Sequence, residues 1–332
     1  MKPQLLTLVL VALLIPVQLP SATPPGHVVI WRAKGCEPLD WYTDRLEIGG
    51  QPVTDAIAIS AGRNHALILR ADGAVVPWGK NLDGQTNVPP GLKNVVQVAA
   101  GDFFSLALGA DGHVSGWGLY PTNSAALKEA IAISAGCGGR ALALTRNGRV
   151  FSSSGRGGFV PGLTNIVAIA AGGGDDERNL ALRKDGTVLA WGGEAAPAGL
   201  SNVVAIAVGE YHSLALKQDG TVYGWGDNHC EQATGVQNPK GQRSASGLVV
   251  NSGQVLSNVV AIAAGNQYAL FGIVSHHSLA LKEDGTVVGW GRICGRPVHV
   301  PEGLSNVVAI AAGQTFCLAI TTNNVVAERF RR

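Results

Sequence analysis

Three histidines occupy the same place in similar stretches of the sequence and are the first candidates for chemistry. His65, His212 and His277 each open a short apolar run, HALIL or HSLAL. Imidazole is the commonest metal ligand in proteins, so equivalent histidines suggest a metal site. Copies of one repeat are spread apart in space, however, and we expect each histidine to make the same structural hydrogen bond. His276 precedes His277, but adjacent strand residues point to opposite faces.

The other candidates for chemistry are acidic. Asp175, Asp176 and Glu177 are consecutive, whereas a calcium loop spaces its oxygen ligands along the chain. We therefore expect a solvated acidic loop. The sequence has no Gly-x-Ser-x-Gly elbow, phosphate-binding loop or HExxH motif. We predict no catalytic residue, no metal and no cofactor. A hydrolase or lyase site assembled from separate repeats stays open as an alternative, as does a structural module of the cell surface.

The elements that position these residues belong to a repeat, best seen in VVAIAVGEYHSLALKQDGTVYGWG at residues 203–226. Its landmark glycine, which closes the AIAAG-like run, recurs at intervals of roughly 37 residues, with two longer intervals. The landmark glycines are Gly62, Gly101, Gly136, Gly172, Gly209, Gly265 and Gly313. The sequence therefore contains seven copies.

Each copy predicts three antiparallel strands. The VVAIAVG run is β-branched at its start, small at its end and too short for a stable helix, so we predict a buried strand nearest a central axis. SLALK alternates as a second strand, and an Asp-Gly or Asn-Gly pair predicts a two-residue type I′ turn. The TVYGWG-like third strand carries Trp78, Trp117, Trp191, Trp225 or Trp290, with Ser153 instead in the third copy. We expect these tryptophans to pack between sheets.

These copies favour an all-β, seven-bladed β-propeller, because one three-stranded unit cannot bury both of its faces without neighbours. Residues 27–31, HVVIW, resemble the third strand without the two that should precede it. The last copy ends in NNVVAERF, a degraded third strand. We predict that residues 27–31 close the propeller by pairing with residues 325–330 or with their blade, which removes exposed edges.

The succession AIAAG, HSLAL, Asp-Gly and TVxGWG resembles the regulator-of-chromosome-condensation repeat family over roughly residues 56–330. With GQTNVPPGL between repeats and an apolar leader, the chain looks most like compact secreted bacterial members that inhibit β-lactamases. The resemblance implies a seven-bladed propeller that works by protein–protein contact. The third copy lacks its tryptophan and the fourth carries GGGDDERN, so the resemblance does not identify the partner.

The N-terminus predicts export. Residues 1–22 have an early lysine, an apolar run from Leu5 to Leu19 and then Pro-Ser-Ala, which is typical of a secretory signal peptide; an uncleaved anchor is the alternative. Residues 23–332 then form a single propeller domain. We expect a secreted, periplasmic or envelope monomer without other membrane contact. Net charge is +2 with no Lys/Arg cluster before the C-terminus, so we expect no nucleic-acid partner.

The sequence also supports predictions for two insertions between repeats and for the five cysteines. Residues 232–254 are rich in Gly, Ser, Asn and Gln and predict a surface loop, whereas residues 266–276 are apolar and form either a packed loop or a contact patch. Cys36, Cys230 and Cys294 each follow a third-strand tryptophan, so we predict that Cys294 bridges one of the other two. Cys137 and Cys317 should be reduced and structural.

The strand order predicts where a partner binds. If the three strands run up, down and up, the G-x-x-H connections and the segments after each Trp-Gly lie on one side, here called the loop face. The Asp-Gly turns lie on the opposite side, the turn face. Both insertions and the irregular segment 32–55 fall on the loop face, and aromatic residues there are typical interface anchors. The predicted partner-binding residues are Trp41, Tyr42, Asn64, Phe103, Phe104, Tyr211, Tyr268, Phe271 and Phe316.

Overall fold

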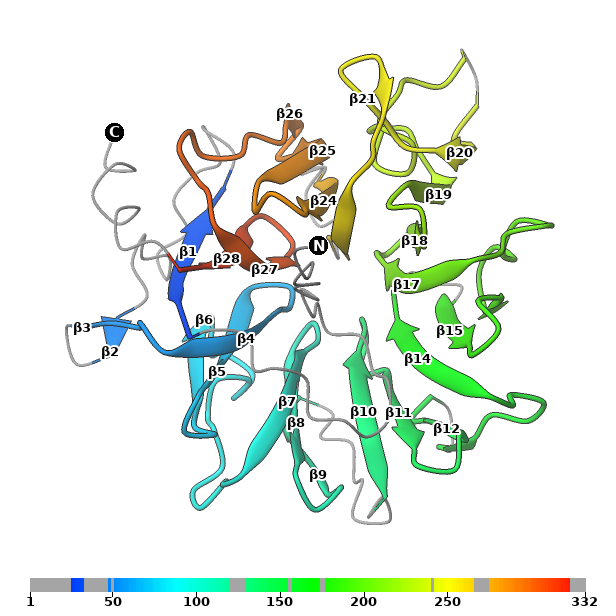
Figure 1. Cartoon of the computed structure of the whole chain (residues 1–332). Helices are drawn as coiled ribbons and strands as arrows, with labels where there is room; N and C mark the ends of the chain where they lie inside the picture. Colours follow the sequence, from blue (N-terminus) through cyan, green and yellow to red (C-terminus); the bar gives the residue numbers. More distant parts are fainter. Residues whose placement is uncertain are drawn as a thin grey trace, which may run out of the picture.

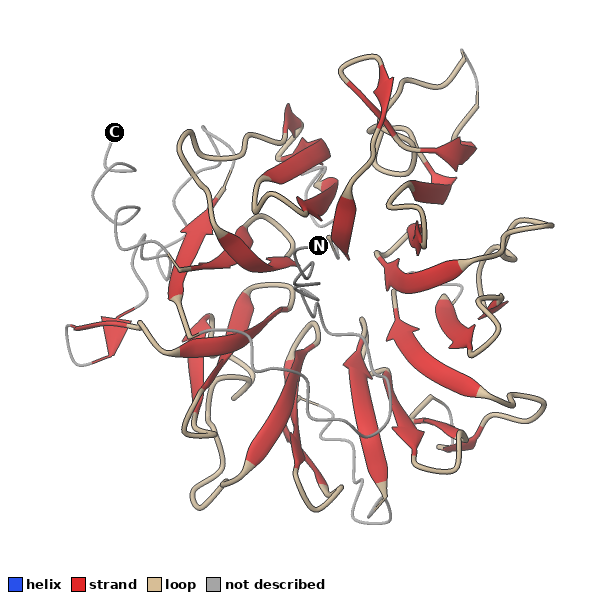
Figure 2. Ribbon diagram, viewed as in Figure 1, coloured by secondary structure: helices blue, strands red, loops and turns tan. Residues whose placement is uncertain are grey.

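The fold is built from antiparallel β-strands. A computed structural model describes residues 25–32, 47–48, 51–119, 129–154, 157–173, 177–239, 242–265 and 275–322. Figure 2 shows strands and loops within these ranges and no helix. Accordingly, the described residues include no helix long and apolar enough to cross a membrane. The predicted signal peptide, residues 1–22, lies outside the described residues.

Within the described residues, seven sheets have three or four strands, and each is named here after its innermost strand. The first three comprise β4 (Ala56–Ala61), β5 (His65–Arg70) and β6 (Val75–Gly79); β7 (Val95–Ala100), β8 (Phe104–Gly109) and β9 (Val114–Gly118); and β10 (Ala130–Ala135), β11 (Ala141–Thr145), β12 (Val150–Ser152) and β13 (Gly158–Phe159). The next two comprise β14 (Ile166–Ala171), β15 (Asn179–Arg183) and β16 (Val188–Trp191); and β17 (Val203–Val208), β18 (His212–Lys217), β19 (Val222–Asp227) and β20 (Ser244–Leu248). The last two comprise β23 (Val259–Ala264), β24 (His276–Lys282), β25 (Val287–Ile293) and β26 (Arg296–Pro297); and β27 (Val307–Ala312), β28 (Cys317–Thr321) and β1 (His27–Trp31). Two small hairpins add β2 (Glu47–Ile48) with β3 (Gln51–Pro52), and β21 (Val250–Asn251) with β22 (Gln254–Val255).

The sheets fan out around a common centre, with the AIAAG strand of each copy innermost (Figure 1). In every one of these sheets the register between the first two strands shifts at the start of the innermost strand, as between Ala56 and Ala58 or between Val203 and Ala205. Such bulges bend and twist a strand. Successive innermost strands contact one another, and β27 and β28 also contact β4. The prediction that this strand lies nearest the centre is confirmed.

The landmark glycines allow this close approach. A Cβ added to Gly209 would lie 2.7 Å from the carbonyl oxygen of Gly265, and one added to Gly313 would lie 3.0 Å from that of Gly62. The same relation holds, in order, for Gly62 with Gly101, Gly101 with Gly136, Gly136 with Gly172, Gly172 with Gly209, and Gly265 with Gly313. A side chain at any of these positions would push neighbouring sheets apart.

The N-terminal strand takes the place of a third strand in the β27 sheet. β1 pairs antiparallel with β28, and Trp31 lies opposite Cys317, as Trp117 lies opposite Ser105 in the β7 sheet. Trp31 is buried in the same cluster as Val29 and Ile310. The predicted pairing of residues 27–31 with this sheet is confirmed, whereas the alternative strand at 325–330 lies outside the described residues.

The tryptophans of the third strands pack between sheets, as predicted. Trp78, Trp117, Trp225 and Trp290 are buried in separate hydrophobic clusters. Trp191 packs against another cluster while partly buried. In the third copy, Ser153 accepts a hydrogen bond from the backbone N–H of Ala141 at 2.8 Å.

The predicted type I′ turns are wrong. Among the described residues, glycine has a positive φ in each turn, for example 80° at Gly73, but the preceding Asp does not. Gly73 N–H donates to the Arg70 carbonyl, and Arg70 N–H donates to the Ala74 carbonyl, which is a three-residue loop ending in a bulge. Asp72 stabilises it by accepting the Ala74 N–H at 2.9 Å.

The insertion at 232–254 is more ordered than the predicted loop. Residues 244–248 form β20, the fourth strand of the β17 sheet, and β21 pairs with β22. Gln232, Ala233 and Thr234 are buried. The surface-loop prediction is wrong for residues 244–248, whose backbone pairs with β19, and for Ala233 and Thr234, whose N–H groups donate to Asn228 Oδ1. Of the apolar insertion at 266–276, residues 266–274 lie outside the described residues, and His276 begins β24.

Candidate functional site

The connections predicted to form the loop face do lie together. In three copies the backbone N–H of the residue after the Trp-Gly pair donates to the carbonyl of a G-x-x-H connection or its equivalent: Lys80 to Asn64, Leu119 to Phe103 and Asp227 to Tyr211, at 2.8 to 2.9 Å. The Asp-Gly turns lie at the other end of the strands, where Gln218 N–H donates to the carbonyl of Asn202, just before β17. The predicted separation into a loop face and a turn face is confirmed.

The three equivalent histidines are structural, as predicted. His65 is hydrogen-bonded to the Ser105 hydroxyl at 3.0 Å, and His212 to that of Ser278 at 2.8 Å. His277 lies 3.4 Å from the Cys317 sulfur. In each case the partner belongs to the next sheet. Burial lowers the pKa of His65 to about 4 and that of His277 to about 3, so both imidazoles are neutral and join neighbouring sheets.

Phe104 and Phe316 were predicted to bind a partner, and this is wrong. Both side chains are fully buried. They occupy the position of His65 in their own copies, and their rings pack against the landmark glycines Gly101 and Gly313. Phe316 also makes an edge contact with Trp78 at a centroid distance of 5.3 Å. These rings fill the sheet junctions and are inaccessible to a partner.

Three predicted partner-binding residues remain available on the loop face. Asn64, Phe103 and Tyr211 are each partly exposed. The Arg63 guanidinium lies over the Phe103 ring at 5.0 Å from its centroid, and Tyr211 makes an edge contact with His276 at 5.8 Å. Trp41, Tyr42, Tyr268 and Phe271 lie outside the described residues.

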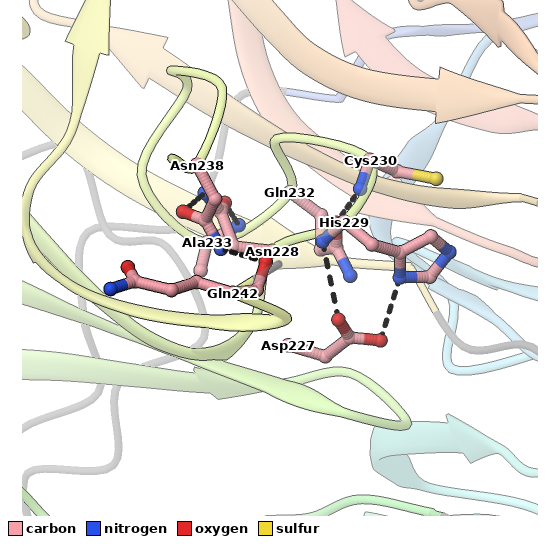
Figure 3. Close-up of polar contacts among 8 residues, drawn as sticks. All are labelled: Asp227, Asn228, His229, Cys230, Gln232, Ala233, Asn238 and Gln242. Carbon is pink, nitrogen blue, oxygen red and sulfur yellow. Dashed lines mark hydrogen bonds and ion pairs between the residues drawn. The ribbon is translucent and has the colours of Figure 1, made fainter. Parts of the chain in front are cut away.

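Two loops after Trp-Gly pairs have the same internal structure. In the first, Asn81 Oδ1 accepts the Thr86 N–H at 3.0 Å, and Gln85 Oε1 accepts the Asp83 N–H at 2.9 Å. In the second, Asn228 Oδ1 accepts the Ala233 N–H at 2.9 Å, and Gln232 Oε1 accepts the Cys230 N–H at 2.9 Å. Figure 3 shows this second arrangement, with Asn228 at its centre. We call these the Asn81 loop (residues 80–87) and the Asn228 loop (residues 227–234).

Each loop is anchored to the next sheet through the backbone of its glutamine. The Gln85 carbonyl accepts hydrogen bonds from the Ser105 hydroxyl at 2.8 Å and from Trp117 Nε1 at 2.9 Å. The Gln232 carbonyl accepts the same pair from Ser278 and Trp290, both at 2.9 Å. The histidine bonded to each serine extends this network into the preceding sheet. Both loops are therefore held in one conformation on the loop face.

The side chains displayed by the two loops differ. Leu82 occupies the third position of the Asn81 loop and is 79% exposed. His229 occupies the equivalent position of the Asn228 loop, where Nδ1 is hydrogen-bonded to Asp227 Oδ2 at 2.7 Å and the ring contacts His276 at 4.9 Å between centroids. Neither residue was predicted from the sequence. The shared spacing W-G-x-N-x-x-x-Q, present at 78–85 and 225–232, is the signal that could have identified both loops.

His276 connects the Asn228 loop to the β23 sheet. Burial, followed by the charge of His229, lowers its pKa to about 4, and Asp227 opposes the shift. At neutral pH this cluster therefore holds a neutral His276 beside the Asp227–His229 pair. Within the described residues, His229 has no serine hydroxyl or cysteine thiol as a hydrogen-bond partner.

The acidic cluster is only partly described. Glu177 forms an ion pair with Arg140 at 3.4 Å, whereas Asp175 and Asp176 lie outside the described residues. Among the residues that the structure describes, no group of three or more His, Cys, Asp or Glu side chains could hold a metal ion.

The cysteines divide into bridged and free. Cys294 is disulfide-bonded, whereas Cys137, Cys230 and Cys317 are free and buried. The predictions of a bridge at Cys294 and of reduced Cys137 and Cys317 are confirmed. Cys230 is excluded as the bridging partner, and the other candidate, Cys36, lies outside the described residues. Burial raises the pKa of the Cys137 thiol, and the nearby Asp102 carboxylate adds to this effect, so the thiol is protonated and a poor nucleophile.

Comparison with known proteins identifies the repeats. The regulator of chromosome condensation (RCC1) repeat model matches residues 56–85, 95–122 and 203–232. No curated protein sequence matches the chain.

Solved structures show the same fold. Prp20p from Saccharomyces cerevisiae is similar with a TM-score of 0.66 and 20% identity, covering 91% of this chain and 93% of that chain. Yeast RCC1 (Prp20) in complex with Kap60 gives 0.62 and 19%, covering 90% of each chain, and human WBSCR16 gives 0.62 and 16%, covering 90% and 100%. At these identities the likeness concerns the fold. The chain therefore contains regulator of chromosome condensation (RCC1) repeats at three places and resembles these solved structures in fold.

Proposed function

We propose that the chain is a seven-bladed β-propeller, closed by its N-terminal strand, that binds another protein through its loop face. The seven larger sheets, the β1–β28 pairing and the contact of Gly313 with Gly62 support the closed arrangement. A ring of sheets with rigid connections at one end is a common scaffold for binding loops. The single observation that carries the binding role is the pair of anchored loops on that face.

We propose that the protein acts outside the cytoplasm, as an inhibitor or adaptor of an extracellular or periplasmic protein. The disulfide at Cys294 supports this, because disulfides persist mainly in oxidising compartments. The leader-like residues 1–22 agree with export. We further propose a monomer without nucleic-acid partners, in keeping with a net charge of +2.

Binding fits the observed site better than catalysis does. Asp227 could orient His229 as a base, but a nucleophile beside it is missing from the described part of the chain. The buried thiols of Cys137 and Cys317 are held protonated by raised pKa values. Asn64, Phe103 and Tyr211, by contrast, are partly exposed on rigid connections, which suits contact with a protein surface.

The test compares the two faces. Secreted and periplasmic proteins from the source cells are passed over immobilised wild-type protein, and each retained protein is then titrated against variants. We expect the triple variant Asn64→Ala, Phe103→Ala and Tyr211→Ala to bind at least tenfold more weakly, since interface anchors contribute about 1–2 kcal/mol each. Lys184→Ala with Gln218→Ala, two exposed residues of the turn face, is the control. Loss of binding in the control alone would refute the proposal.

A further inference from the structure

Leu82 is the most exposed of the large hydrophobic residues that the structure describes, at 79%. It belongs to none of the hydrophobic clusters formed by the described residues. A single exposed leucine is ordinary on a protein surface. What sets Leu82 apart is the loop that carries it.

The Asn81 loop holds Leu82 in place without burying it. Asn81 Nδ2 donates to Asn87 Oδ1 at 2.8 Å, and Asn87 N–H donates to the Gly84 carbonyl at 3.0 Å. The buried Gln85 fixes the loop to the β7 sheet. A side chain on such a loop loses little conformational freedom of the backbone when it binds, and this preorganisation favours affinity.

The Asn228 loop shows that a side chain at this position can make contacts within its own protein. There the equivalent residue, His229, turns onto His276 and is hydrogen-bonded to Asp227 within the molecule. Both residues are exposed, but His229 is held by two contacts within the molecule, whereas the Leu82 side chain lies in solvent.

Further apolar residues lie beside the Asn81 loop. Leu119 is 39% exposed, and its N–H donates to the carbonyl of the partly exposed Phe103 at 2.9 Å. A Cβ on Gly84 would lie 3.9 Å from the Cα of Gly118, which precedes Leu119. Leu82, Phe103 and Leu119 thus belong to adjoining segments of the loop face.

Two charges flank Leu82. Lys80 and Asp83 are both partly exposed, and neither forms an ion pair with any described residue. An apolar centre with unpaired charges at its rim matches the anatomy of a protein interface, where rim charges set orientation and association rate.

We propose that Leu82 is the anchor of the loop face and enters an apolar pocket of a folded partner protein. A carboxylate of the partner lies beside Lys80, and a cationic side chain of the partner lies beside Asp83. This inference rests on the proposed protein-binding function and identifies the element that carries it.

The shape of the site selects this kind of partner. Leu82 projects from a loop, so the complementary surface is concave, whereas a small molecule or an extended peptide requires a concavity on this chain. Insertion into a lipid surface requires a larger apolar face with cations around it. The carboxylate of Asp83 next to a single projecting leucine does not provide that.

The first experiment is site-specific photocrosslinking. Full-length protein carrying p-benzoylphenylalanine in place of Leu82, or in place of the exposed Val96 in β7 as a control, is irradiated with the extracellular and periplasmic fractions and with a whole-cell lysate. We expect one cross-linked protein from position 82 and none from position 96, with cross-linking abolished by excess wild-type protein. Absence of a cross-link at position 82 in all fractions, or cross-linking only between two copies of this chain, would overturn the proposal.

The second experiment measures affinity for the cross-linked protein. We expect Leu82→Asp to weaken binding at least 30-fold, Leu82→Ala about tenfold, and Lys80→Glu and Asp83→Lys each about three- to tenfold. An unchanged midpoint of urea unfolding shows that each variant is folded. If Leu82→Asp binds normally while the triple variant at Asn64, Phe103 and Tyr211 does not, the inference fails and the proposed function stands. If both bind normally, both fail. Leu82-dependent flotation with phosphatidylcholine–phosphatidylglycerol vesicles, without a protein cross-link, would indicate membrane docking and refute it.

Discussion

Replacement of a landmark glycine by alanine tests the packing at the centre of the sheets, and Gly209→Ala is the sharpest case. Its φ lies outside the range that excludes L side chains, so the expected effect is steric. The added Cβ would lie 2.7 Å from the Gly265 carbonyl oxygen and 2.6 Å from His212 Cε1, whereas ordinary contact begins at 3.4 Å. The His212 ring cannot swing away without breaking its 2.8 Å hydrogen bond to Ser278.

The expected cost follows from that overlap. Both neighbours must move by more than half an ångström, and overpacking of this kind costs about 1–3 kcal/mol. The gain from the lower chain entropy of unfolded alanine offsets about 0.4–1 kcal/mol of this. We therefore expect a net loss of about 1–2 kcal/mol in the free energy of unfolding. Because the steric overlap lies between the β17 and β23 sheets, the loss of stability should affect both sheets.

Urea unfolding followed by tryptophan fluorescence provides the measurement. Gly247→Ala in β20 is the matched control, because nothing lies within 4 Å of the added Cβ. We expect its midpoint to equal or slightly exceed that of the wild type. If Gly209→Ala is as stable as Gly247→Ala, the landmark glycines do not set the spacing of the sheets, and the packing argument is refuted.

Further predictions concern the histidines, the loops and the disulfide. His65 has a pKa of about 4 in the folded protein and near 6.5 when unfolded. Protonation of the unfolded state therefore lowers the free energy of unfolding as the pH falls from about 6.5 to about 4, by about 3 kcal/mol in total. His65→Phe, which copies Phe104 and Phe316, should make the urea midpoint depend less on pH between pH 7 and 4.5. An unchanged pH dependence would contradict the lowered pKa of His65. Asn228→Asp should lower the urea midpoint far more than Asn81→Asp, because Asn228 is buried and donates to Thr234, Val236 and Asn238, whereas Asn81 is exposed; equal losses would show that the buried network contributes nothing extra. In urea without reductant, iodoacetamide should alkylate Cys137, Cys230 and Cys317 but leave Cys294 unmodified until a reductant is added, and peptide mass spectrometry would expose the opposite result.

Much of the fold was predictable because the repeat carries redundant signals. The alternation in SLALK, the Asp-Gly turn and the Trp-Gly pair recur together, so each strand is supported by its copies. The match of HVVIW to a third strand was enough to predict its pairing with the last sheet. The turn type was not predictable, since Asp-Gly suits both a type I′ turn and a type I turn with a bulge.

The site was predicted less well because burial depends on the neighbouring copy. Phe104 and Phe316 look like exposed aromatics of a connection, yet they align with His65 and fill the space beside a landmark glycine. Comparison of the copies position by position would have placed both in the core. The fourth strand β20 has no apolar alternation, and only its pairing with β19 reveals it. Leu82 was not predicted as a site residue because the sequence pattern does not show whether a single leucine is exposed.

The pairing of β1 with β28 has a consequence for how the chain folds. His27 and Thr321 are partners, although almost the whole described chain separates them. The other six larger sheets are built from strands that follow one another and can form locally, as soon as each copy is available. The sheet containing β1 must wait until β27 and β28 have been synthesised, since loop closure over this length is slow. Until then β1 is an unpaired apolar strand. If the chain is kept unfolded until synthesis is complete, β1 is never exposed next to sheets that have already folded.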